Sequence, residues 1–124
     1  LAPRRALVGG WLAFAAAYAG LACADALPLA IPCMLGVAVA YGVAEPAERA
    51  LVASLSPAGR SGAAFGWYTL VQGLMALPAG LLAGWLWDRG PHGPATAFAA
   101  TAALAATAAV LLTVTVRDHR PRAA

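Results

Sequence analysis

The sequence predicts an all-α membrane protein with four membrane-spanning helices arranged as two hairpins. Of its 124 residues, 62% are hydrophobic and only 10% are charged, so a water-soluble fold could not cover this much apolar surface with polar side chains. Four uncharged runs, over residues 6–24, 26–44, 62–87 and 94–116, are each long enough to cross a hydrocarbon core of about 30 Å. Because unpaired backbone amides are costly in lipid, we expect these runs to be helices of a single membrane region.

The connections between the runs arrange them in pairs. A short stretch over residues 23–28 joins the first run to the second, which is typical of a tight helical hairpin. A longer polar segment over residues 45–61 follows, and we predict it to be a loop that separates the two hairpins. Trp85 and Trp87 stand at the end of the third run, where amphipathic indole rings favour the headgroup region of the bilayer. They therefore predict a helix end independently of the charges.

The distribution of arginines predicts the orientation in the membrane. With four spans, both termini and the 45–61 loop share one side, and that side carries every arginine except Arg89. The positive-inside rule then predicts a multi-pass protein of the plasma (bacterial inner) membrane, with both termini, the loop and the 117–124 tail in the cytoplasm. The net charge of +3 does not indicate a nucleic-acid partner, because the arginines are scattered over short loops. The lipid bilayer is the first partner that we expect.

One face of the third run carries a stripe of glycines that predicts close helix packing. At 100° per residue, five glycines fall on one side of this helix and include two small-xxx-small pairs. Such faces let helix backbones approach closely in lipid, where no hydrophobic effect drives helices together. The helix-packing stripe consists of Gly62, Gly66, Gly73, Gly80 and Gly84.

A small polar face lies on another side of the same run. Gln72 is the only amide side chain in any run, and it should face protein or a watery cavity because an unpaired amide in lipid is costly. A solute pathway and an ordinary interhelical hydrogen bond both satisfy this requirement, and both interpretations stay open. The phenol of Tyr41 in the second run either lines the same pathway or anchors the helix at the headgroups. The substrate-pathway candidates are Tyr41, Tyr68, Gln72 and Met75.

Charged residues gather in the polar segment between the hairpins. Glu45 and Arg49 are four residues apart and can pair on one helix face, while Arg60 could reach another acid. Such pairs could help to close the cytoplasmic side in one conformational state. They could equally be exposed loop pairs that contribute less than about 1 kcal/mol. The candidates for a cytoplasmic gate are Glu45, Glu48, Arg49 and Arg60.

Two segments resemble the major facilitator superfamily (MFS) of transporters. Residues 45–68 (EPAERALVASLSPAGRSGAAFGWY) resemble the loop between the tenth and eleventh helices of that family. Residues 77–88 (LPAGLLAGWLWD) are similar to the end of the eleventh helix in many bacterial members. The resemblance implies that the four runs are helices nine to twelve of an MFS-type twelve-helix transporter fold. Since the chain begins with Leu1 and not Met, we expect it to be the C-terminal part of a longer protein.

The resemblance implies secondary-active transport of a small solute by alternating access of two six-helix halves. It places the tenth helix beside a central cavity, the eleventh at the interface of the halves, and the ninth and twelfth on the lipid side. The implied partners are the N-terminal helices of the same transporter and an unknown solute that protons could drive, with no cofactor. The runs contain no carboxylate, so we expect a proton-coupling acid to lie elsewhere in the protein, or the protein to be a uniporter.

Other protein classes explain the sequence less well. Residues 59–62 (GRSG) resemble the nucleophile motif of rhomboid proteases, but His92 is predicted at the opposite membrane face, so we expect no enzyme. A signal peptide that ends near Cys23 would need a Leu three residues before the cysteine, where this sequence has Gly20. Three more spans also follow. Cys23 and Cys33 are expected to be buried thiols, with a disulfide left open. The main alternative is a self-contained four-helix membrane protein, either a scaffold subunit or a small dimeric exporter.

Overall fold

The protein is all-helical over residues 3–115, the part that the computed structural model describes. The four helices are α1 (Pro3–Ala22), α2 (Leu27–Leu55), α3 (Ser61–Trp87) and α4 (Gly93–Thr115). Each of them is long and apolar enough to cross a membrane by length and composition. The prediction of four apolar helices of membrane-spanning length is therefore confirmed. The 117–124 tail, which was predicted to be cytoplasmic, lies outside the described residues.

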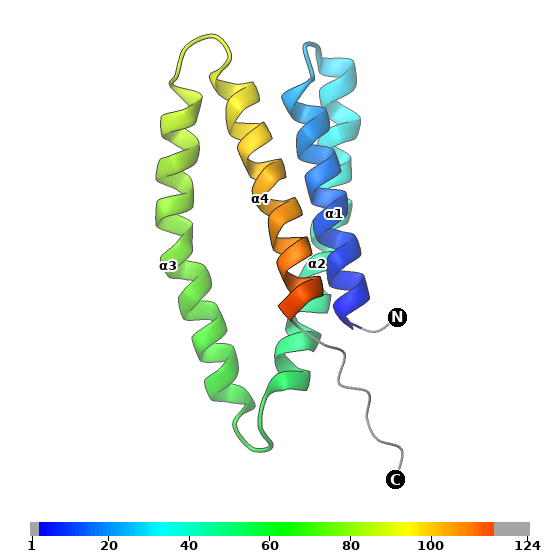
Figure 1. Cartoon of the computed structure of the whole chain (residues 1–124), viewed down its shortest axis with the longest axis vertical. Helices are drawn as coiled ribbons and strands as arrows, with labels where there is room; N and C mark the ends of the chain where they lie inside the picture. The colour runs from blue at the N-terminus through cyan, green and yellow to red at the C-terminus, as the bar shows by residue number, and fades with distance from the viewer. Residues whose placement is uncertain (1–2, 116–124) are drawn as a thin grey trace.

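The helices run up and down in sequence order, so that successive helices are antiparallel. Figure 1 shows the start of α1, the end of α4 and the α2–α3 connection at one end of the molecule. The α1–α2 and α3–α4 connections lie at the other end. Two glycines with positive φ shape these connections, Gly59 (φ 79°) before α3 and Gly90 (φ 85°) after it. Only glycine adopts this backbone conformation without a steric penalty.

Helix α2 is longer than the sequence predicted. The uncharged run was expected to end at residue 44, but the helix continues to Leu55, so the predicted 45–61 loop is wrong over most of its length. Alanine, glutamate and arginine are strong helix formers, and an Arg49–Glu45 pair supports the extra turns. The helix ends where Ser56 adopts an extended conformation (ψ 134°), because a residue before proline avoids the helical region.

Helix α2 consequently brings carboxylates into a candidate membrane span. The candidate span Leu27–Leu55 owes its apolar character to an uncharged stretch that ends at residue 44, and Glu45 and Glu48 follow that stretch in the same helix. The uncharged run over residues 26–44 contains no carboxylate, but the helix continues beyond that run and carries both acids in its last turns. Glu48 lies about two helical turns before the end of α2.

The packed core lies among α1, α2 and α4 and is built mainly from small side chains. Leu7, Ala44 and Ala47 form its centre, with Trp11 and Phe14 packed against them. A Cβ atom placed on Gly10 would lie 3.0 Å from the Cβ of Ala44, so the backbones of α1 and α2 approach closely there. Small residues allow such close packing of helices in lipid. The other buried residues are also small, and they are Gly10, Ala40, Gly93, Ala97, Ala102 and Ala109.

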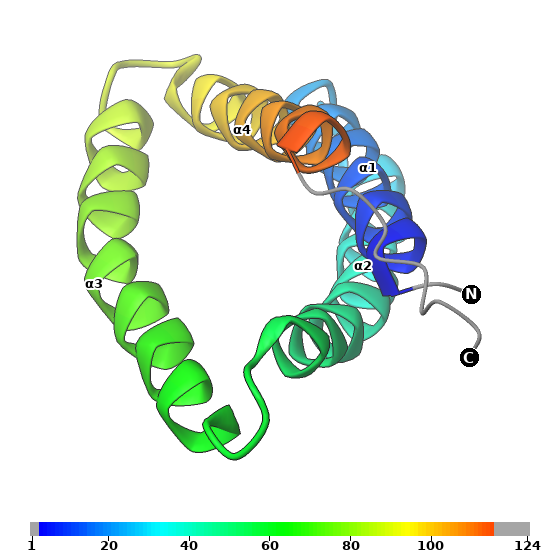
Figure 2. The same cartoon turned by 60° about the horizontal axis from the view of Figure 1, so that its bottom comes forward.

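Helix α3 stands apart from this core. It contacts α4 and α2 through only a few residues and has no buried residue of its own. Figure 2 shows α3 separated from α1, with α4 and the end of α2 on either side. Large apolar side chains of α3 are consequently exposed, including Trp67 (69%) and Leu81 (76%). The predicted glycine stripe contacts no other helix within residues 3–115, because a Cβ atom placed on any of its five glycines meets nothing within 4 Å.

The threonines of α4 and the two cysteines have ordinary structural roles. Every threonine hydroxyl of α4 donates to a backbone carbonyl three or four residues earlier, which satisfies these hydroxyls within their own helix. Cys23 and Cys33 are both free thiols, so the open question of a disulfide is answered in the negative. Cys23 is exposed, and its predicted burial is wrong because it lies in the α1–α2 turn.

Candidate functional site

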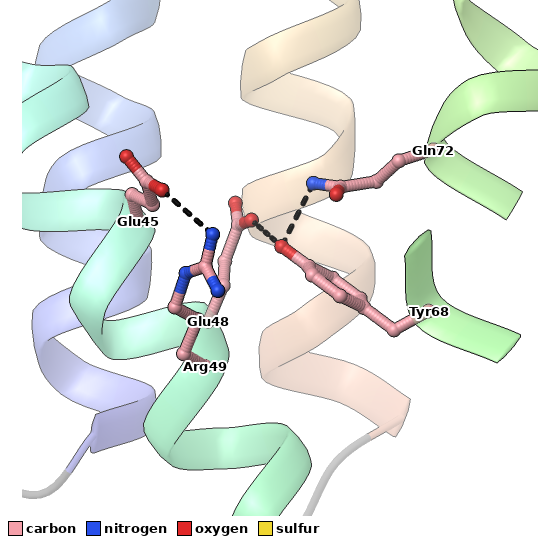
Figure 3. A network of polar contacts seen from close by, with 5 residues as sticks. All are labelled: Glu45, Glu48, Arg49, Tyr68 and Gln72. Atoms are coloured by element: carbon pink, nitrogen blue, oxygen red, sulfur yellow. Dashed lines mark hydrogen bonds and ion pairs between the residues drawn. The ribbon is translucent and has the colours of Figure 1, made fainter. Parts of the chain in front are cut away.

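Polar side chains from three helices meet at the carboxylate of Glu48. The hydroxyl of Tyr68 on α3 donates a hydrogen bond of 2.6 Å to Glu48 Oε2, and the indole Nε1 of Trp11 on α1 donates one of 3.0 Å to Glu48 Oε1. Gln72 Nε2 donates in turn to the Tyr68 hydroxyl at 2.8 Å (Figure 3). One carboxylate of α2 therefore holds both α1 and α3 through neutral donors.

Helical spacing explains why these groups are available to one another. Tyr68 and Gln72 are four residues apart, so their side chains lie above each other on one face of α3. Glu45 and Arg49 have the same spacing on α2 and form an ion pair of 3.0 Å, which confirms the pairing predicted from the sequence. The Arg49 and Glu45 side chains are 61% and 43% exposed, so this pair is largely solvated and weak.

The same groups line a cavity of about 260 Å³. Its aromatic wall includes Phe14 and Tyr41, whose ring centroids are 6.1 Å apart at an interplanar angle of 78°. Tyr41 is 59% exposed, so this part of the wall is not buried in the described structure. The lining side chains come from α1, α2 and α3, and they are Phe14, Tyr41, Ala44, Glu45, Glu48, Arg49, Tyr68 and Gln72.

The structure places two predicted groups of residues in one cavity. Tyr41, Tyr68 and Gln72 were candidates for a solute pathway, whereas Glu45, Glu48 and Arg49 were candidates for a gate; all six line the cavity. Their roles stay predictions, but their proximity follows from the unexpected length of α2, which carries the acids alongside α3.

Two candidates lie away from the cavity. Met75 is exposed on α3 and does not line it. Arg60 occupies the N-cap position of α3 and makes no side-chain capping hydrogen bond. The ion pair suggested for Arg60 is not formed with any acid of residues 3–115.

The sequence interpretation missed the contribution of α1. Trp11 donates to Glu48, and Phe14 forms part of the cavity wall. A usable signal was present, because an indole N–H inside an apolar span needs an acceptor. Trp11 could therefore have predicted a polar group on a neighbouring helix, although not which group.

The protease motif and metal sites find no counterpart in the described residues. Ser61 begins α3 and His92 follows its other end, so the length of the helix, about 40 Å, separates them. No three side chains of His, Cys, Asp or Glu within residues 3–115 gather in a way that could hold a metal ion. The chemistry that the cavity offers is hydrogen bonding, charge and aromatic contact.

Comparisons of the chain with protein-family models, with curated proteins and with solved structures found no match.

Proposed function

We propose that this chain is the C-terminal part of a secondary-active transporter of the major facilitator type, which moves a small solute across the bacterial inner membrane by alternating access. The observation that carries the proposal is a cavity with charged walls among helices that are apolar and long enough to cross a membrane. Ionisable groups within such helices are costly and commonly mark the pathway of a solute or an ion.

The exposure of α3 supports a larger assembly of helices. This helix has no buried residue, and its glycine face contacts nothing within residues 3–115. In lipid, helices associate by close packing at small residues, so this face is suited to receive another membrane helix. The family resemblance assigns the corresponding helix to the interface between the two halves of a transporter. The partners of α3 are then further helices of the same protein.

The network at Glu48 supports a moving helix. Helix α3 has few contacts with α2 and α4, and the hydrogen bond between Tyr68 and Glu48 is a direct polar link between α3 and α2. Loss of that link allows α3 to tilt relative to α2 while α1 stays packed against α2 and against α4. Glu48 and Tyr68 thereby line the solute site and also hold one conformational state.

The orientation is part of the proposal, with both termini and the α2–α3 connection in the cytoplasm. Single cysteines at Ala58 and Asp88, in a background where Cys23 and Cys33 are alanine, test it. A membrane-impermeant maleimide should label Asp88→Cys in intact cells and Ala58→Cys only after permeabilisation. Labelling of both positions from the same side would contradict a topology in which α3 crosses the membrane.

Transport itself is tested with the full-length gene product in membrane vesicles. We expect vesicles that contain the protein to accumulate a solute when an ion or solute gradient is applied. Vesicles without the protein should not accumulate it. Glu48→Gln should reduce the initial rate about tenfold or more, which corresponds to about 1.4 kcal/mol. Asp88→Asn is the matched control, because Asp88 is an exposed acid at the other end of α3. A gene product with only these four spans and no transport activity would favour the self-contained four-helix alternative.

A further inference from the structure

The charges that line the cavity do not cancel. Glu45 and Glu48 each carry a negative charge, and Arg49 is the one positive side chain in the described lining. Arg49 already pairs with Glu45 at 3.0 Å. The cavity therefore keeps a net negative charge, which is that of Glu48.

The hydrogen bonds of Glu48 orient its carboxylate without neutralising it. Both of its donors, the Trp11 indole and the Tyr68 hydroxyl, are uncharged. A carboxylate has about four acceptor sites, so each oxygen keeps capacity for a further donor. Glu45 Oε2 accepts no hydrogen bond from any group of residues 3–115. Two carboxylates thus present free acceptor sites, and the cationic side chain of the described lining, Arg49, is paired with one of them.

Most of the uncharged side chains in the cavity wall are aromatic. Phe14, Tyr41 and Tyr68 line the cavity, and the steep angle of 78° between the first two rings makes a corner instead of a flat stack. The face of an aromatic ring attracts a cation through its quadrupole within about 6 Å of the centroid. Aromatic rings beside a carboxylate are a recurrent arrangement for ammonium groups, because the rings desolvate the methylene or methyl groups and the acid neutralises the charge.

From these contacts we propose that the cavity binds a small organic cation, a solute that carries a primary or quaternary ammonium group. This inference rests on the proposed transport function and names the substrate class of the same site. The ammonium group lies between Glu48 and Glu45, and its carbon substituents contact Phe14 and Tyr41. The volume of about 260 Å³ is just below the usual range of about 300–1,000 Å³ for ligand sites, so the solute is small.

An anionic solute fits the cavity less well. It would need to take Arg49 from Glu45 and would then leave two carboxylates beside it without a counter-charge. Like charges inside one small cavity repel each other, and the repulsion is stronger inside an apolar bundle than in water.

Matched isosteres test the inference on the full-length gene product in detergent, by isothermal titration calorimetry. Choline, 3,3-dimethylbutan-1-ol and 3,3-dimethylbutyrate have nearly the same shape but are cationic, neutral and anionic; tetramethylammonium and propylammonium extend the set of cations. We expect at least one cation to bind, and choline to bind about tenfold or more tightly than its neutral isostere. Equal or tighter binding of the neutral or anionic isostere would overturn the inference, as would the absence of binding by every cation.

Variants assign the binding to this cavity. Glu45→Gln removes a charge that no interhelical hydrogen bond uses, and it should weaken cation binding about threefold or more. Glu48→Gln should weaken it further, with helical content checked by circular dichroism because Glu48 also holds two helices. Asp88→Asn should leave it unchanged. If Glu45→Gln and Asp88→Asn behave alike, the cation binds elsewhere and the inference is wrong.

The two proposals fail in different ways. If the protein transports a solute but the anionic or neutral probe binds best, the transporter proposal stands and the cation inference is wrong. If no solute of any charge is bound or transported, both are wrong.

Discussion

The hydrogen bond between Tyr68 and Glu48 makes a quantitative prediction about stability. Tyr68→Phe removes a hydroxyl that donates to Glu48 Oε2 at 2.6 Å and accepts from Gln72 at 2.8 Å. A hydrogen bond to a charged group contributes about 1.5–3 kcal/mol, and the contribution is smaller here because the groups are only partly buried and water can replace the hydroxyl. We expect the free energy of unfolding to fall by about 1–2 kcal/mol.

The assay is reversible unfolding in mixed micelles, followed by circular dichroism. Tyr18→Phe is the matched control, since the Tyr18 hydroxyl forms no hydrogen bond with any group of residues 3–115. This control should change the free energy of unfolding by less than about 0.5 kcal/mol.

A double-mutant cycle separates the hydrogen bond from other effects of the substitutions. Glu48→Gln, Tyr68→Phe and the double variant should give a coupling free energy of about 1 kcal/mol between the two positions. A coupling below about 0.3 kcal/mol would refute the reasoning, because α3 would then be held to α2 by something other than this bond.

Two further predictions concern α1 and α2. Gly10→Leu should lower the free energy of unfolding by about 1–3 kcal/mol, because even its Cβ atom would lie 3.0 Å from the Cβ of Ala44. Gly9→Leu is the control and should destabilise less, because Gly9 is exposed and a Cβ atom there meets nothing within 4 Å. Similar unfolding curves for both variants would contradict the close approach of α1 and α2. Arg49→Gln should change stability by less than about 1 kcal/mol, since its pair with Glu45 is exposed, and a larger loss in the same unfolding assay would show a stronger role.

Much of the architecture could be predicted from local sequence. Four apolar runs with few charges are sufficient to predict four helices of membrane-spanning length, because backbone amides cannot stay unpaired in lipid. The ion pair of Glu45 and Arg49 was also predictable, since a spacing of four residues places both side chains on one helix face. The threonine hydroxyls of α4 follow the same kind of short-range rule.

The length of α2 was missed for a reason that is also local. Polar residues after position 44 were interpreted as a loop, although alanine, glutamate and arginine favour helix. Pro46 lies inside the helix without ending it, and the helix stops only before Pro57. A change from apolar to polar side chains reports where the surroundings change and not where a helix ends.

Local sequence patterns are sufficient to identify the four helices, whereas the contacts between the helices appear only in the folded arrangement. Periodicity placed Tyr68 and Gln72 on one face of α3, but not against Glu48, which is twenty residues away on another helix. Nor did it show that Trp11 of α1 reaches the same carboxylate. The physical reason is that backbone geometry fixes neighbours three and four residues apart, whereas contacts between helices depend on how small residues such as Gly10 and Ala44 let those helices pack.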